Sequence, residues 1–90
     1  RRQVMDDLLA MDVIKIKSSD TNVNRAFRYL FDKYYPVIIR YLVYRKGLND
    51  RAAEDIAQQM FINVNRNPHS FTNGSLISWL KKKCKSALTY

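Results

Sequence analysis

Side chains suited to ligand binding are concentrated in residues 75–86, near the end of the chain. This segment combines serines, one tryptophan and four lysines: Ser75, Trp79, Lys81, Lys82, Lys83, Lys85 and Ser86. Lysine ammonium groups bind phosphates, and an aromatic face stacks on an exposed base. No acidic residue follows Asp55. The pattern indicates a polyanionic ligand, chiefly nucleic acid, with an anionic membrane surface or a merely solubilising lysine face as alternatives.

Patterns for catalysis and metal binding are sparse. One Cys and one His are too few for a four-ligand structural zinc site, and one Cys forms no internal disulfide. Gly47 and Gly74 stand apart, so there is no glycine-rich phosphate loop. Cys84 falls on an apolar stripe, which favours an inert buried thiol over a reactive one. We therefore expect a cytoplasmic binding module with no enzyme activity, no cofactor and no metal.

The composition fits one small helical domain. The 90 residues carry a formal net charge of +8, and 47% of them are hydrophobic, enough for a packed core. Two Gly and two Pro are too few for the tight turns of a small β-barrel. No apolar run is long enough to span a membrane, so we expect no membrane insertion. Because the chain starts at Arg1 without a Met, we expect it to be a piece of a longer protein.

Hydrophobic spacing predicts an all-α fold, a compact orthogonal bundle of three to four helices. The expected parts are a leading helix within 1–20, a long helix within 21–47 that is kinked at Pro36, a helix over 50–67, a loop at 68–74 and a final helix over 75–90. The final helix would present the lysines, and the loop before it would lie next to them.

The helix expected at 50–67 has two contrasting faces. Its apolar stripe should form core: Ala53, Ile56, Ala57, Met60, Phe61 and Val64. The opposite face carries residues at helical spacing that should meet solvent: Asp55, Gln58, Gln59 and Ile62. Three polar groups around one apolar side chain suit a partner helix, whereas the plain alternative is a solvated face with a stray isoleucine.

Three stretches in this order carry a family resemblance: residues 26–36 (AFRYLFDKYYP), residues 54–62 (EDIAQQMFI), and Phe71 followed by residues 75–80 (SLISWL). Together they resemble region two of bacterial sigma-70-family factors, nearest to the extracytoplasmic-function (group four) type, over roughly residues 10–90. The resemblance implies a domain that binds the clamp helices of the largest subunit of core RNA polymerase. It also implies recognition and melting of the promoter minus-ten element by capture of a flipped non-template base. Region four is absent from these residues.

Carried over by position, the resemblance places polymerase binding on Asp55, Gln58 and Gln59, with the neighbouring Ile62 as an apolar anchor. It places DNA binding on the loop and the final helix: Phe71, Asn73, Ser75, Trp79, Lys81, Lys82, Lys83, Lys85 and Ser86. Phe71 has two equal alternatives, stacking on a base or anchoring the loop to the core. For Trp79, packing under the loop is favoured over base stacking. For Asn73 and Ser75 the alternatives to base contact are a turn and a helix cap.

Some positions depart from the family pattern. Lys82 and Lys83 stand where primary sigma factors carry a tryptophan pair, and Ser86 stands where an asparagine is common. With these departures, the chain resembles a specialised sigma factor that has its own promoter preference. The interpretation would fail if Gln58 and Trp79 were both buried and no cavity lay beside residues 69–74.

Two other functions remain open. One is a sigma-like interaction module that binds an anti-sigma factor or another regulator, with DNA binding incidental. Its apolar contact strip would combine Ile62 with Val4, Leu8 and Met11 of the leading helix. The other is a basic helical domain that coats nucleic acid without sequence preference.

Overall fold

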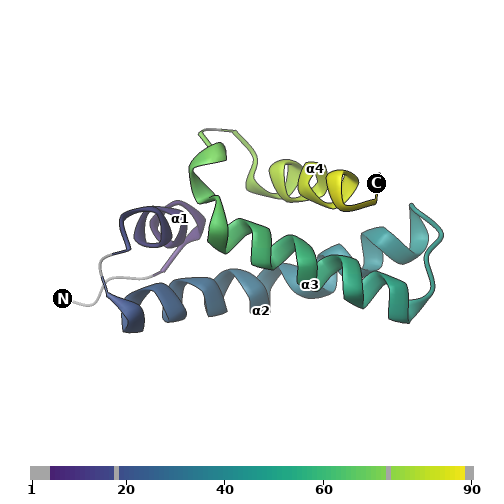
Figure 1. Ribbon diagram of the computed structural model, residues 1–90, viewed down its shortest axis with the longest axis horizontal. Coiled ribbons are helices and arrows are strands. Elements are labelled where there is room, and N and C mark those ends of the chain that lie inside the picture. The colour runs from purple at the N-terminus through teal and green to yellow at the C-terminus, as the bar shows by residue number, and fades with distance from the viewer. Residues whose placement is uncertain (1–4, 18, 73, 89–90) are drawn as a thin grey trace.

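The computed structural model describes residues 5–17, 19–72 and 74–88, and within them the regular structure is entirely helical (Figure 1). The elements in chain order are α1 (Asp7–Ile16), α2 (Asp20–Tyr44), α3 (Asp50–Arg66), the short 3-10 turn η1 (Pro68–Ser70) and α4 (Leu76–Leu88). The all-α prediction is confirmed. The loop expected at 68–74 begins with a 3-10 turn, because Pro68 has no amide hydrogen to give and its fixed φ suits the first position of a helical turn.

Polar side chains set the helix starts that the sequence predicts. Ser19 Oγ accepts a hydrogen bond from the Asn22 amide at 3.1 Å, and Asn49 Oδ1 accepts one from Ala52 at 2.8 Å. Ser75 Oγ accepts from the amide three residues further along at 3.4 Å. Each bond satisfies one amide hydrogen that the first helical turn leaves without a partner. Within the expected range 1–20, α1 starts after its own cap at Asp6, whose carboxylate accepts a hydrogen bond from the Leu9 amide at 2.8 Å.

The core lies where α3 meets the aromatic side of α2. The Phe61 ring is 1% exposed, and its centroid lies 5.0 Å from that of Phe31 and 6.1 Å from that of Phe27. Phe31 in turn stacks on Tyr35 with 4.6 Å between centroids. The predicted core stripe of α3 is confirmed for its buried members: Ala53, Ala57, Met60, Phe61 and Val64. Ile56 is only partly buried, at the edge of that stripe.

The helices are arranged around α3, which packs against α2 on one side and α4 on the other (Figure 1). The first helix, α1, packs on α2 and touches η1, so the N-terminal part of the fold meets the loop between α3 and α4. The molecule measures 44 × 24 × 23 Å, and α2 runs through Pro36 to Tyr44 along its length. Among the described residues, none of the helices could serve as a transmembrane span.

Candidate nucleic-acid and protein-binding surfaces

A cavity of about 340 Å³ lies between the loop after α3 and the first turns of α4. Four hydroxyl side chains, two aromatic rings and one lysine line it: Ser70, Phe71, Thr72, Ser75, Ser78, Trp79 and Lys82. The α4 members recur every three or four residues, so they project from one side of that helix. A cavity is therefore present beside the loop before α4.

The two aromatic residues of this cavity differ in exposure. Phe71 is 3% exposed, and its ring centroid lies 5.4 Å from that of Trp79 at a tilt of 55°. Of the two alternatives for Phe71, the structure shows the anchor, because its ring holds the loop to the core. Trp79 is half-buried under the loop, and the Lys83 ammonium lies 5.2 Å from its centroid. Trp79 thus combines a packing contact under the loop with a cation over its ring.

Sequence reasoning missed a lysine that holds the loop. Lys15 of α1 donates a hydrogen bond from Nζ to the Phe71 carbonyl at 2.6 Å, and its Nζ also lies 5.5 Å from the centroid of the Phe71 ring. Fifty-six positions separate the two residues. No local pattern in the sequence signals such a contact, since it exists only after α1 has packed beside the loop. Lys15 is therefore a positioning residue for the cavity wall.

The lysines of α4 do not form one surface. Lys82 lines the loop cavity, and Lys82 and Lys85 are exposed. Lys81 points to the opposite flank, where its Nζ lies 5.0 Å from the centroid of the Tyr41 ring on α2. Successive residues of an α-helix are rotated by about 100° around its axis, so adjacent lysines face different neighbours. Asn73, the remaining loop candidate, lies outside the described residues.

The four residues predicted to bind polymerase are all exposed: Asp55, Gln58, Gln59 and Ile62. Ile62 is 45% exposed, in contrast to its buried neighbour Phe61. Since the opposite side of α3 forms the core, these side chains share a solvent face. We call these four residues the α3 outer face.

Ser86 lies next to a different surface from the loop cavity. It borders a groove of about 540 Å³ together with two residues of the α3 outer face, Asp55 and Gln59. The cavity beside the loop does not include it. Seven residues separate Ser86 from Trp79, which is about 10 Å along a helix. The assignment of Ser86 to DNA binding stays a prediction.

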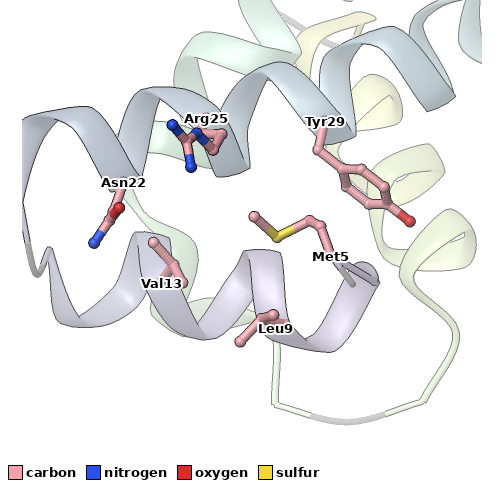
Figure 2. Close-up of a pocket in the computed structure, with 6 residues that line it drawn as sticks. All are labelled: Met5, Leu9, Val13, Asn22, Arg25 and Tyr29. Carbon is pink, nitrogen blue, oxygen red and sulfur yellow. The ribbon is translucent and has the colours of Figure 1, made fainter. Parts of the chain in front are cut away.

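A further groove of about 470 Å³ runs between α1 and α2 where the two helices pack, and Figure 2 shows the side chains around it, from both helices and from Met5 just before α1. Met5, Leu9, Val13, Asn22, Arg25 and Tyr29 line this groove. The apolar strip predicted for a regulator is wrong in part, because Met11 is 1% exposed and belongs to the core. Leu8 is 65% exposed, as that prediction needs. Val4 lies outside the described residues.

One ionisable cluster and one buried thiol serve the fold. Tyr34 donates a hydrogen bond to the Asp7 carboxylate, and Lys33 pairs with the same carboxylate at 3.0 Å, which joins α2 to α1. Burial, supported by the bond to Asp7, raises the pKa of Tyr34 to about 12. The hydrogen bond to Asp7 also raises the pKa of Lys33 above its usual range. Burial raises the pKa of the Cys84 thiol to about 11, so this thiol stays protonated at neutral pH.

Neither a metal site nor a matching protein helps to assign a function to these surfaces. Within residues 5–17, 19–72 and 74–88, no three His, Cys, Asp or Glu side chains gather as a metal site would require. Comparison of the chain with models of protein families, with curated proteins and with solved structures finds no match.

Proposed function

We propose that this chain is a sigma region-two-like domain of the extracytoplasmic-function type. In this proposal the α3 outer face binds the clamp helices of core RNA polymerase, and the loop cavity holds an unpaired base from the non-template strand of the minus-ten element. The chain then works in the cytoplasm by binding alone, without catalysis. The observation that carries the proposal is the pairing of an exposed polar face on α3 with a hydroxyl-rich, aromatic cavity beside lysines of α4.

The loop cavity suits a splayed nucleotide for three reasons. Its hydroxyl groups on Ser70, Thr72, Ser75 and Ser78 can donate to and accept from a base edge. The half-buried Trp79 offers an aromatic edge or face. The lysines beside the cavity provide cations for the adjoining phosphates. A duplex hides its base faces, so such a cavity selects for single-stranded or flipped nucleotides.

The α3 outer face suits a helical partner. Ile62 gives one apolar side chain that can be buried on binding, and Asp55, Gln58 and Gln59 surround it with polar groups. An apolar centre within a polar rim is the usual arrangement of a protein interface. No residue of this face lines the loop cavity, so the two activities can be separated by mutation.

The DNA half of the proposal is tested by fluorescence anisotropy with a labelled minus-ten-like non-template oligonucleotide. We expect Trp79→Ala to weaken binding about tenfold, as loss of one stacking partner does. Lys82→Gln is a second variant at an exposed site, chosen because it does not disturb the Phe71 contact. The control is Arg28→Gln on the exposed side of α2. Unchanged affinity in both cavity variants would contradict the proposal.

The polymerase half is tested with a purified clamp-helix fragment in a pull-down or titration. Asp55→Asn and Ile62→Lys should reduce this binding but leave the oligonucleotide affinity at its original value, because neither residue touches the loop cavity. Asp12→Asn, an exposed acid on α1, is the matched control. If the α3 variants bind the fragment as tightly as the original chain, α3 is not the polymerase contact.

The α1–α2 groove favours a second candidate, the sigma-like interaction module that binds an anti-sigma factor or another regulator. Its apolar lining from Met5, Leu9 and Val13 suits the apolar face of an amphipathic helix, and Arg25 suits an acidic flank on that helix. A photo-cross-linking residue at position 13 tests it. Cross-links to a regulator, together with no oligonucleotide binding by the chain, would favour this candidate over the first.

A further inference from the structure

A second basic groove, of about 520 Å³, lies on the other flank of α4, between that helix and the C-terminal half of α2. Val37, Arg40, Tyr41, Tyr44, Arg45 and Lys81 line it. None of these residues is acidic, and half of them carry a positive charge. This α2–α4 groove plays no part in the proposed polymerase contact or in the loop cavity, which has a different set of lining residues.

The aromatic and cationic groups of the groove are interleaved. The ammonium groups of Lys81 and Lys46 lie 5.0 Å and 5.8 Å from the centroid of the Tyr41 ring. Tyr44 is 79% exposed, which is high for so large an aromatic side chain. Cations beside tyrosine rings provide two things that a single strand needs, namely phosphate partners and stacking faces.

The three cations that line the groove, and Lys46 next to Tyr41, are available for an external anion. Across the described parts of the chain, Arg40, Arg45, Lys46 and Lys81 form no ion pair with an acidic side chain. Two acids of α3, Asp50 and Glu54, border an adjoining groove, which shares Arg40 and Tyr44 with the α2–α4 groove. Neither acid lines the α2–α4 groove, and Lys81 does not line the adjoining one.

We propose that the α2–α4 groove is a second binding site for single-stranded nucleic acid, with the cations on its phosphates and Tyr44 stacked on a base. Charge complementarity decides the class of ligand, since a groove with three cationic and no acidic lining residues attracts a polyanion. A membrane surface fits less well. Interfacial helices bury a broad apolar face, whereas the apolar side chain here is Val37, flanked by tyrosines and arginines. The site stands independently of the proposed sigma function.

The affinity test uses the chain with fluorescein-labelled oligothymidylate. We expect Tyr44→Ala and Arg45→Gln each to weaken binding about five- to tenfold, and Tyr44→Phe, which keeps the ring, to bind like the original chain. Arg28→Gln is the control, because it removes the same charge from α2 about 25 Å away along the helix. Tyr44 is so exposed that its replacement should leave the helical circular dichroism signal unchanged.

The location test uses oligothymidylate that carries 5-iodouracil, which cross-links to a stacked aromatic side chain on illumination. Trypsin cleaves after Arg40 and Arg45, so a cross-link to Tyr41 or Tyr44 appears on the peptide of residues 41–45. A cross-link in the loop cavity appears on the peptide of residues 67–81. We expect both peptides to be labelled.

The outcomes separate this inference from the proposed function. If Tyr44→Ala and Arg45→Gln bind like Arg28→Gln, or only residues 67–81 are cross-linked, the groove site is overturned and the loop cavity is untouched. If only residues 41–45 are cross-linked, the groove site stands and the DNA half of the proposed function fails. Vesicles of phosphatidylcholine and phosphatidylserine form the last arm. Binding to them that depends on Tyr44 and Arg45, without oligonucleotide binding, would show a membrane site instead.

Discussion

At the scale of single residues, Lys15 controls the loop from another helix. Its hydrogen bond to the Phe71 carbonyl is short and charge-assisted, and bonds of this kind contribute about 1.5 to 3 kcal/mol. We expect Lys15→Gln to speed amide hydrogen exchange in residues 69–72 by roughly tenfold or more, because each 1.4 kcal/mol lost makes local opening tenfold more frequent. Lys17→Gln, at an exposed position nearby, should leave that exchange unchanged. Equal exchange in the two variants would show that the bond does not hold the loop.

The Cys84 thiol predicts a pH dependence of stability. Burial raises its pKa from an ordinary value near 9 to about 11. Between these values the unfolded chain has lost the thiol proton and the native chain keeps it, so the native state binds more protons and the free energy of unfolding falls as pH rises. Below about pH 9 this contribution is present in full. Urea titrations at pH 8 and pH 10 should show a smaller fall in Cys84→Ala than in the original chain. An equal fall would place the thiol in contact with water.

At the scale of elements, α3 carries adjacent residues with opposite roles. Phe61 is 1% exposed among the rings of α2, whereas Ile62 next to it is 45% exposed. We expect Phe61→Ala to lower the free energy of unfolding by about 3 to 5 kcal/mol, as large-to-small core changes do. Ile62→Ala should change it by less than about 0.5 kcal/mol, which is usual for a surface site. Denaturant titration measures both. A large loss in Ile62→Ala would mean that this side chain supports the fold and is not reserved for a partner.

The same helix shows what its sequence can predict. Ala53, Met60 and Phe61 could be assigned to the core because helical periodicity is a local property that tertiary contacts rarely override in a long amphipathic segment. The starts of α2, α3 and α4 were likewise predictable from Ser19, Asn49 and Ser75, since a cap acts on amides only two or three residues away.

The parts that could not be predicted all depend on how separate helices meet. The neighbour of Lys81 is Tyr41, forty positions earlier, and the partner of Lys15 is Phe71. Ser86 faces α3 because of the position of α4 across it, which no spacing within α4 reveals. A helical wheel shows which side of a helix is apolar, but it does not show which neighbour lies beyond each edge of that side.

At the scale of the whole molecule, α4 separates two basic surfaces. Lys82 borders the loop cavity on one flank, and Lys81 borders the α2–α4 groove on the other. The absence of acids after Asp55 means that no carboxylate in the sequence of α4 offsets these charges. One short helix can therefore present cations in two directions while its remaining side, with Leu76, Leu80 and Cys84, is buried.

This arrangement leads to a test of whether nucleic acid binds at built sites or simply follows the net charge of +8. Each lysine or arginine that neutralises a phosphate of a single strand adds about 0.7 to the slope of log affinity against log salt concentration. We expect Lys82→Gln to reduce the slope for a labelled single strand by about this amount. Lys17→Gln removes the same charge from α1, away from both basic surfaces, and should leave the slope unchanged. The two variants have equal net charge, so a difference between them can come only from local contact. Equal slopes would indicate that the chain coats nucleic acid through its overall field, without a defined site.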